Sequence, residues 1–214
     1  MKKIISLALI LLTFTLTLAG CGGKDIYFDG KYDSAKYALN TDLDGARFLV
    51  PVEYNNVKQS QEEINNELKK IESKDEQLKF IQTRVTYVTD GTDYQIIKPG
   101  EFYLYVLNLK GLKNIDQLTD LSTLSQALGV DKFISFKDSN VEKYKCEKKN
   151  DYARATFSAI ITDLQFKTDY QGYVSIIEDS DKGTVYAIVV GFGDTKHNST
   201  AKEIATNLYL AETK

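Results

Sequence analysis

Two apolar segments near the carboxyl end of the chain limit the folds open to it more than any other feature. Tyr173–Ile177 and Thr184–Phe192 are rich in valine, isoleucine and tyrosine, and the turn-forming run Asp179–Gly183 separates them. This pattern predicts two β-strands joined by a hairpin. Because both segments are apolar at successive positions, the sheet that they form needs a cover on each face.

A terminal helix is the expected cover of one face. Thr200–Glu203 has the sequence of a capping box, in which the threonine oxygen accepts a backbone N–H and the glutamate reaches back to the threonine N–H. The predicted helix runs through Ile204, Ala205 and Leu208. Ile204 and Leu208 stand one turn apart and therefore share a face.

Seven further segments have the composition of β-strands. They are Arg47–Val52, Arg84–Thr89, Thr92–Ile97, Glu101–Leu109, Phe133–Phe136, Tyr152–Asp163 and Leu164–Thr168. Asp90-Gly91 is a strong hairpin signal, and Pro99-Gly100 marks the next turn.

Two further helices are expected, each with one apolar face. Ser60 and Glu63 form the capping box of the first helix, and Ser73–Glu76 offers a second possible start. The apolar residues of this first helix give a single stripe, which predicts contact with the core. They are Ile64, Leu68, Ile71, Leu78 and Ile81. The second helix opens at Asn114 and ends before Gly129.

The order of these elements predicts an α+β fold, an antiparallel sheet with helices packed on its faces. The strand Ala46–Pro51, and the pair Gly172–Ile177 and Gly183–Val190 leading into the last helix, resemble the PsbP-like family. That family includes photosystem extrinsic subunits, a nuclear-import Ran-binding factor and many exported bacterial lipoproteins. The resemblance lies in element order and in the ending of two strands and a helix, and it implies a PsbP-like fold. It carries no functional residue across.

The first 23 residues resemble the signal of a bacterial lipoprotein. Lys2 and Lys3 form a positive start, residues 4–18 carry no charge, and Leu18-Ala19-Gly20-Cys21 closes the run as a lipobox. The resemblance implies signal cleavage between Gly20 and Cys21. It also implies a diacylglyceryl group on the Cys21 thiol and usually a further acyl chain, such as palmitate, on the new amino terminus. A spanning helix would need about 20 apolar residues, and this run is shorter and interrupted.

The lipoprotein signal divides the chain into three parts. Residues 1–20 are the expected signal peptide, residues 21–36 a lipidated tether, and residues 37–214 a single α+β domain. Two or three lipid chains make a stable anchor, so the mature protein is expected on the extracytoplasmic face of the cell membrane. Tyr27 and Phe28 interrupt the polar tether. The tether is expected to dock partly on the domain, or at the membrane interface where amphipathic rings settle.

The charge of the mature chain argues against nucleic acid as a partner. Loss of Lys2 and Lys3 with the signal leaves 25 of the 27 basic residues against 30 acidic ones. A domain with net negative charge is not attracted to nucleic acid, nor to anionic lipid beyond the hold of its acyl chains.

Few side chains are available for nucleophilic, redox or zinc chemistry. With Cys21 committed to lipid, Cys146 is the one remaining cysteine, which leaves no internal disulfide and no C-x-x-C motif. His197 is the only histidine, so a His-rich zinc site cannot be assembled, and a Ser-His-Asp triad would have to use this residue. The sequence also lacks a Gly-x-Ser-x-Gly, His-Glu-x-x-His or P-loop motif, and no cofactor is expected.

One segment has part of the pattern of a calcium loop. Asn40, Asp42 and Asp44 place oxygen-bearing side chains at alternate positions before Gly45, as in the first half of an EF-hand. The twelfth position is Pro51 instead of a bidentate glutamate, and no helix follows. A polar turn that leads into a strand is the preferred interpretation, and no metal site is expected.

These observations leave two hypotheses of function. The first is a non-enzymatic, lipid-anchored binding or assembly protein of the bacterial cell envelope, whose partner is an envelope protein or a small ligand. The second is an envelope hydrolase that uses paired carboxylates or His197. A deep pocket holding two carboxylates about 5 to 9.5 Å apart, or His197 bonded to a serine, would favour the enzyme.

Overall fold

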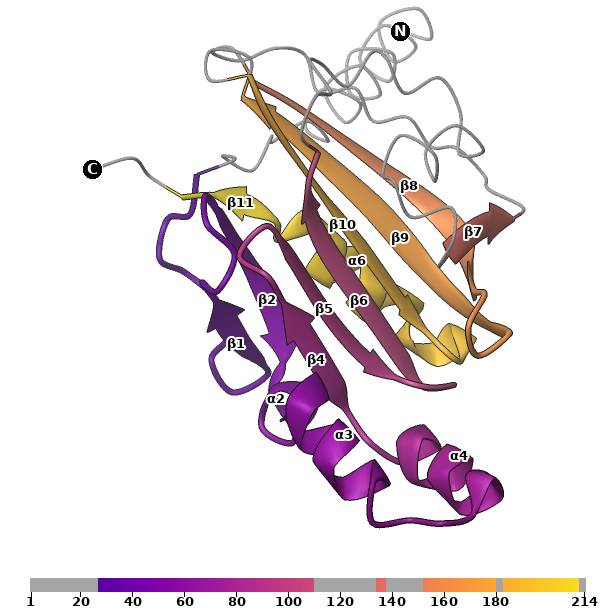
Figure 1. Cartoon of the computed structure of the whole chain (residues 1–214). Coiled ribbons are helices and arrows are strands. Elements are labelled where there is room, and N and C mark those ends of the chain that lie inside the picture. The colour runs from indigo at the N-terminus through magenta and orange to yellow at the C-terminus, as the bar shows by residue number, and fades with distance from the viewer. Residues whose placement is uncertain (1–26, 110–133, 138–151, 180–182, 212–214) are drawn as a thin grey trace, which may run out of the picture.

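The computed structural model describes residues 27–109, 134–137, 152–179 and 183–211. Within these residues the fold is α+β and consists mostly of strands (Figure 1). The strands are β1 (Tyr37–Asn40), β2 (Ala46–Pro51), β3 (Gln59–Ser60), β4 (Thr86–Thr89), β5 (Asp93–Lys98), β6 (Phe102–Asn108), β7 (Ile134–Lys137), β8 (Tyr152–Asp163), β9 (Thr168–Asp179), β10 (Thr184–Phe192) and β11 (Tyr209–Leu210). The helices are α2 (Val52–Asn55), α3 (Gln61–Leu68), α4 (Lys74–Gln82), the 3-10 turn η2 (Thr195–His197) and α6 (Asn198–Thr206).

The described strands form two sheets. The large sheet has eight strands in the order β3-β4-β5-β6-β10-β9-β8-β7, and the small sheet has three in the order β1-β2-β11. The expected antiparallel sheet is in fact mixed, because β3 pairs with β4 in parallel. The chain passes through α3 and α4 between these two strands, and this crossover brings it back to run in the same direction.

The centre of the large sheet follows the sequence prediction closely. β8 and β10 have the predicted bounds, and β10 pairs with β9 on one side and with β6 on the other. Alternate residues of β10 enter two separate hydrophobic clusters, as the two-residue period of a strand requires. Ile188 and Val190 belong to one cluster, and Val185 and Val189 belong to the other. The expectation that this strand is buried on both faces is confirmed.

Helix α6 covers one face of β9 and β10, as expected. Its residues Ala201, Ile204 and Ala205 are fully buried. The predicted extension of the helix through Leu208 is wrong, because α6 ends at Thr206, but Leu208 is fully buried just after that end. The predicted capping box at Thr200–Glu203 is wrong, because the helix already begins at Asn198. The cap lies earlier in the sequence: the Asp194 carboxylate accepts the backbone N–H groups of η2, which runs directly into the helix.

The end of α6 is tied to strand β8 by one arginine. The Arg154 guanidinium donates to the carbonyl oxygen of Leu208 at 2.7 Å and also to that of Thr206. The carbonyls at a helix carboxyl end have no partner within the helix, and the guanidinium charge complements the helix dipole there. Arg154 thus fixes where the chain leaves the helix for β11.

The predicted strand Leu164–Thr168 is wrong, because residues 164–167 form the turn between β8 and β9. The Asp163 carboxylate accepts the backbone N–H groups of Gln165 at 2.8 Å and Phe166 at 3.1 Å, which stabilises the turn. Lys167 completes it with a positive φ of 54°. β9 starts only at Thr168 and is longer than the predicted Tyr173–Ile177.

The predicted stripe of the first helix divides between two helices. Ser60 caps α3 through the full capping box with Glu63, and Ser73 caps α4, which confirms the alternative start. The expected core contact along the stripe is wrong, because α4 contributes no fully buried residue and Leu78 is 49% exposed. Of the stripe, only Ile64 is fully buried. The break after α3 resets the helical phase, so residues spaced along one continuous helix no longer share a face.

The small sheet stands beside α6 and includes the chain's first described residues. β1 and β2 form an antiparallel hairpin, and β11 pairs with the other edge of β2. Tyr27 forms a parallel bridge with Leu210, so the described part of the predicted tether docks on the domain. Residues 1–26, which include Gly20 and Cys21, and the predicted helix from Asn114 lie outside the described residues.

Candidate binding pocket beside the amino-terminal segment

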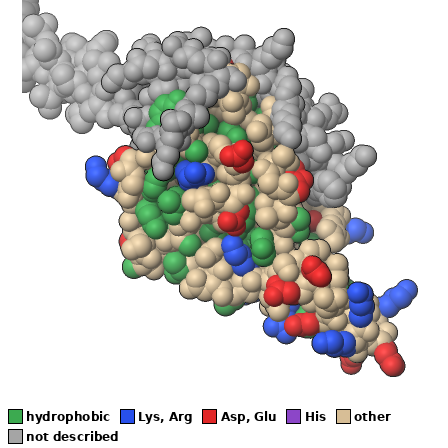
Figure 2. Space-filling model, turned by 60° about the vertical axis from the view of Figure 1, so that its left-hand side comes forward, with side chains coloured by type: hydrophobic (Ala, Val, Ile, Leu, Met, Phe, Trp, Pro, Cys, Tyr) green, Lys and Arg blue, Asp and Glu red, His purple; other side chains and the backbone are tan. Residues whose placement is uncertain are grey.

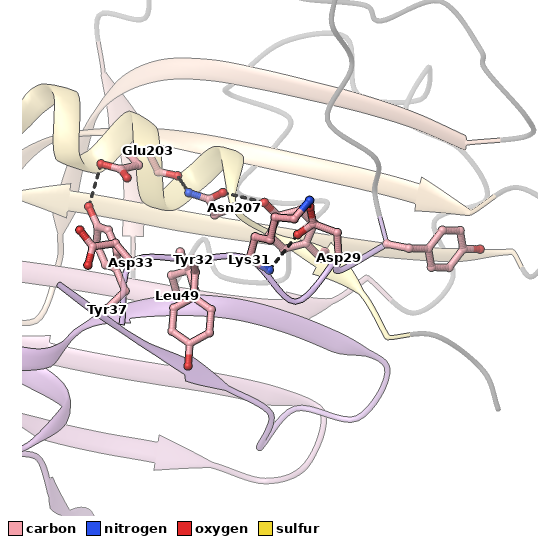
Figure 3. Close-up of a pocket in the computed structure, with 10 residues that line it drawn as sticks. Asp29, Lys31, Tyr32, Asp33, Tyr37, Leu49, Glu203 and Asn207 are labelled. Atoms are coloured by element: carbon pink, nitrogen blue, oxygen red, sulfur yellow. Dashed lines mark hydrogen bonds and ion pairs between the residues drawn. The ribbon is translucent and has the colours of Figure 1, made fainter. Parts of the chain in front are cut away.

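A pocket of about 340 Å³ lies between the amino-terminal segment, the small sheet and the end of α6 (Figure 3). It exists because Tyr27 pairs with Leu210 and the chain then runs along α6 before it enters β1. Its lining is mostly polar and aromatic. The lining residues are Tyr27, Asp29, Lys31, Tyr32, Asp33, Tyr37, Leu49, Glu203, Asn207 and Tyr209.

Three hydrogen bonds fix the wall of the pocket, and one of them joins the side chains of distant segments. The Tyr37 hydroxyl donates to Glu203 Oε2 at 2.8 Å, which joins β1 to α6 (Figure 3). The Tyr209 hydroxyl donates to Asn207 Oδ1 at 2.7 Å, and the Asn207 amide donates to the Glu203 carbonyl at 2.7 Å. Burial, and then the Glu203 carboxylate, raise the pKa of Tyr37, so its hydroxyl stays protonated and acts as a donor.

The carboxylates of the pocket differ in their partners. Asp29 lies 3.5 Å from the Lys31 ammonium, and Asp33 lies 3.6 Å from that of Lys36. The backbone N–H of Lys31 donates to Asp29 and lowers the pKa of that carboxyl group. Among the described residues, Glu203 has no lysine or arginine within ion-pair distance. The pocket is therefore suited to polar ligands and presents one uncompensated negative charge.

A second hollow, of about 350 Å³, lies on the other side of the Tyr37–Glu203 hydrogen bond. His197 lines it, stacked on Phe192 with ring centroids 4.9 Å apart. The His197 Nδ1 atom lies 2.8 Å from Asp194 Oδ1, and this contact lowers the pKa of Asp194. Within the described residues the His197 ring has no hydrogen bond to a serine.

The Asp194 carboxylate orients the His197 imidazole. A carboxylate and an imidazole in this arrangement are two of the three members of a hydrolytic triad. Two carboxylates, Glu53 and Glu203, also line this second hollow. Thr200, on the first turn of α6, is the only serine or threonine that lines this hollow among the described residues. The sequence singled out His197, but the position of Glu53 and Glu203 beside it follows only from packing.

The candidate calcium residues form a turn with its own internal partners. The Asn40 amide donates to Asp42 Oδ2 at 3.2 Å, and Asn40 Oδ1 accepts the Asp42 backbone N–H at 2.9 Å. The carbonyl oxygen of Asp44 accepts the Tyr186 hydroxyl at 2.7 Å, and Leu43 is fully buried. No group of three or more acidic, histidine or cysteine side chains that could hold a metal occurs in the described part of the chain.

A half-buried lysine between two tyrosines has no signal in the sequence. The Lys58 ammonium donates to the Tyr94 hydroxyl at 3.1 Å, lies 4.8 Å from the centre of the Tyr87 ring and is 4.0 Å from Asp42. Burial lowers the pKa of Lys58, and the Asp42 charge opposes that shift. The three partners come from β4, β5 and the β1–β2 turn, so no local spacing in the sequence connects them.

Helices α3 and α4 form an arm that projects from the sheet (Figure 1). We call residues 61–82 the helical arm. Charged side chains of both signs gather on this projecting part (Figure 2). Leu78 is 49% exposed among them, and Ile71, Phe80 and Ile81 are partly exposed. The Gln77 amide donates to the carbonyls of Leu68 and Ile71, which holds the two helices together.

Cys21 and Cys146 both lie outside the described residues, so the lipidation site and the free thiol stay predictions. No helix among the described residues is long and apolar enough to cross a membrane. No family model matches this chain, and no curated protein sequence matches it.

Proposed function

We propose that this chain is a non-enzymatic, lipid-anchored binding or assembly protein of the bacterial cell envelope, held on the extracytoplasmic face of the membrane through Cys21. The lipobox supports the location. The helical arm is the observation that carries the binding function. In this arm α3 buries only Ile64 completely and α4 buries no residue completely, so most of its apolar area is left for contact with another molecule.

The surface of the arm combines apolar and charged side chains, as the core and rim of a protein interface do. Leu78, Ile71 and Ile81 supply apolar area, and the surrounding lysines and glutamates supply a polar rim. A hollow of about 110 Å³ lies where the arm meets the sheet, with Ile64, Ile81 and Val88 in its lining. The partner that we propose is therefore an envelope protein that offers an apolar side chain to this hollow.

The PsbP-like resemblance belongs to the same proposal. β9, β10 and α6 form the ending of two strands and a helix on which the resemblance rests, and α6 covers the strands that precede it. We infer a PsbP-like domain from this ending. Exported lipoproteins of that family are consistent with an anchored envelope domain.

The Asp194–His197 pair gives the hydrolase a specific observation in its favour. The pair has the geometry to orient an imidazole, and the neighbouring hollow of about 350 Å³ could hold a substrate. A triad would also need a nucleophile bonded to His197. Among the described residues Asp194 is the only side chain that bonds to this ring, so the binding protein remains our first proposal.

Site-specific photocrosslinking in living cells tests the binding function. A photoreactive residue replaces Leu78 in the arm, and a matched control replaces Lys196, which is exposed in η2. We expect a discrete protein adduct from position 78 and none from position 196. Adduct formation at position 78 should disappear when Ile81→Asp places a charge in the adjoining hollow. Equal labelling from both positions, or none from position 78, would contradict the proposal.

A further inference from the structure

The fold begins very close in sequence to the predicted lipid anchor. Tyr27 is paired with Leu210 and packs on the main hydrophobic cluster, and it lies only six positions after Cys21. A fully extended chain spans at most about 3.6 Å per residue, so the Tyr27 end of the domain lies within roughly 20 Å of the lipidated cysteine. Lipidation at Cys21 would therefore keep this end of the domain close to the bilayer.

Aromatic side chains gather at this end. We call Tyr27, Phe28 and Tyr32 the aromatic edge, and the buried ring of Tyr209 supports it from within the domain. The Phe28 ring centre lies 5.5 Å from that of Tyr209 and 6.0 Å from that of Tyr32, and Tyr32 is 39% exposed. Rings with an apolar body and a polar tip settle where hydrocarbon meets water, as in the aromatic belts of membrane proteins.

Charge at the aromatic edge does not oppose contact with lipid. Residues 27–36 contain two aspartates and two lysines, and each aspartate is paired with a lysine, Asp29 with Lys31 and Asp33 with Lys36. The segment is therefore neutral, and its attraction to a bilayer must come from the rings. The side chain of Lys31 is 87% exposed and can extend its ammonium group into the headgroup layer.

We propose that the aromatic edge is a second, non-covalent membrane contact, which rests on the headgroup layer of the bilayer and holds the domain in one orientation. This inference rests on the proposed anchoring through Cys21. The proposed orientation places the pocket of about 340 Å³ beside the lipid headgroups, because Tyr27 and Tyr32 of the aromatic edge also line that pocket. The helical arm lies far from β11, at the other end of the described structure (Figure 1). The proposed orientation therefore directs the arm away from the membrane.

The absence of tryptophan from the chain makes a direct test possible. Single-tryptophan variants of the full lipidated protein, Tyr32→Trp at the aromatic edge and Leu78→Trp in the arm, are reconstituted in phosphatidylcholine vesicles. A fraction of the lipid carries a spin label on its headgroup and quenches nearby tryptophan. We expect loss of most of the Tyr32→Trp emission and little change for Leu78→Trp. Phe28→Trp gives a second position at the edge, and thermal melting of each variant confirms that it is folded.

Vesicle flotation separates the two proposals. If the protein floats with the vesicles and Tyr32→Trp and Phe28→Trp are quenched no more than Leu78→Trp, the anchor stands and the membrane-facing edge is refuted. If the wild-type chain does not float, or floats equally well as Cys21→Ala, the proposed lipid anchor fails and the inference fails with it. Flotation that depends on Cys21, together with selective quenching at positions 28 and 32, supports both.

Discussion

At the scale of single residues, Gly45 shows how one backbone position ties the small sheet to the large one. It ends the β1–β2 turn with a φ of +78°, and a Cβ atom there would lie 2.2 Å from the Tyr186 hydroxyl oxygen. That hydroxyl donates to the Asp44 carbonyl and accepts the Asn108 amide. The turn that resembles half of a calcium loop is thus positioned by a tyrosine of β10.

We expect Gly45→Ala to lower the free energy of unfolding by more than Gly91→Ala. Gly91 also has a positive φ, +84°, but has open space around its Cα, so its substitution carries only the conformational cost of about 1–2 kcal/mol. Gly45→Ala adds the clash with Tyr186. Urea unfolding measures both variants, and Tyr186→Phe should reduce the cost of Gly45→Ala. Equal losses at the two glycines would show that Tyr186 moves aside freely.

A second prediction at this scale concerns pH. Asp163 is 3% exposed, and burial raises its pKa above the usual value, although the N–H groups of Phe166 and Gln165 oppose the shift. The native state then holds this proton more tightly than the unfolded chain does. The stability that the group provides when protonated is therefore lost as the pH rises through the raised pKa.

Asp163→Asn removes this titration and keeps an oxygen that can accept from Gln165 and Phe166. We expect the free energy of unfolding of the variant, minus that of the wild type, to increase from pH 3 toward pH 7. Any loss of stability caused by the amide itself does not depend on pH in this range and does not change this trend. Urea midpoints across that range measure the difference. A flat difference, or one that falls with rising pH, would show that Asp163 is not destabilised by its burial.

At the scale of elements, α6 and α4 have similar sequences of polar and apolar residues but opposite roles. α6 buries Ala201, Ile204 and Ala205 against β9 and β10, and its end is held by Arg154. α4 buries no residue completely. The difference lies in what stands opposite each helix, which is an apolar sheet for α6 and solvent for much of α4.

We therefore expect Leu208→Ala and Leu78→Ala to differ strongly. Leu208 is fully buried, and truncation of a buried leucine typically costs about 2–5 kcal/mol. Leu78 is 49% exposed, and a surface substitution usually changes stability by no more than about 0.5 kcal/mol. Chemical denaturation of both variants gives the comparison. A silent Leu208→Ala would mean that the turn from α6 to β11 is peripheral to the fold.

At the scale of the whole molecule, the amino-terminal segment belongs to the folded domain and also leads to the anchor. Tyr27 pairs with Leu210, and Phe28 packs edge-on against Tyr209. Both partners lie in β11, which is itself the outer strand of the small sheet. The segment thus closes the small sheet at the end that we place beside the membrane.

Removal of residues 22–36 should consequently weaken the fold to a measurable degree. A chain that begins at Tyr37 loses the Tyr27 bridge and the Phe28–Tyr209 contact, and an aromatic pair alone contributes about 0.5–1.5 kcal/mol. We expect a drop in the urea midpoint that is smaller than that of Leu208→Ala. A shortened chain as stable as the full mature domain would show that the docked segment contributes no net stability.

Local sequence alone was enough for the long central strands, the α+β class and several turns. β8 and β10 have the bounds that their composition predicts, because long runs of valine, isoleucine and aromatic residues favour strands wherever they lie. The caps at Ser60 and Ser73 are local hydrogen bonds across three residues, so local spacing was sufficient to find them. The sequence misplaces the start of α6, because Asp194, the residue that caps η2, lies outside the predicted capping box Thr200–Glu203.

Only the tertiary structure decided which residues form the pocket and which apolar faces are buried. Tyr37 and Glu203 meet across 166 positions of sequence, and Lys58 finds its three partners on separate elements. No local spacing records such contacts. The stripe from Ile64 to Ile81 has the periodicity of a core helix, yet only Ile64 is fully buried. Amphipathic periodicity shows that a helix has an apolar face, whereas the packing of the whole chain decides whether another element covers it.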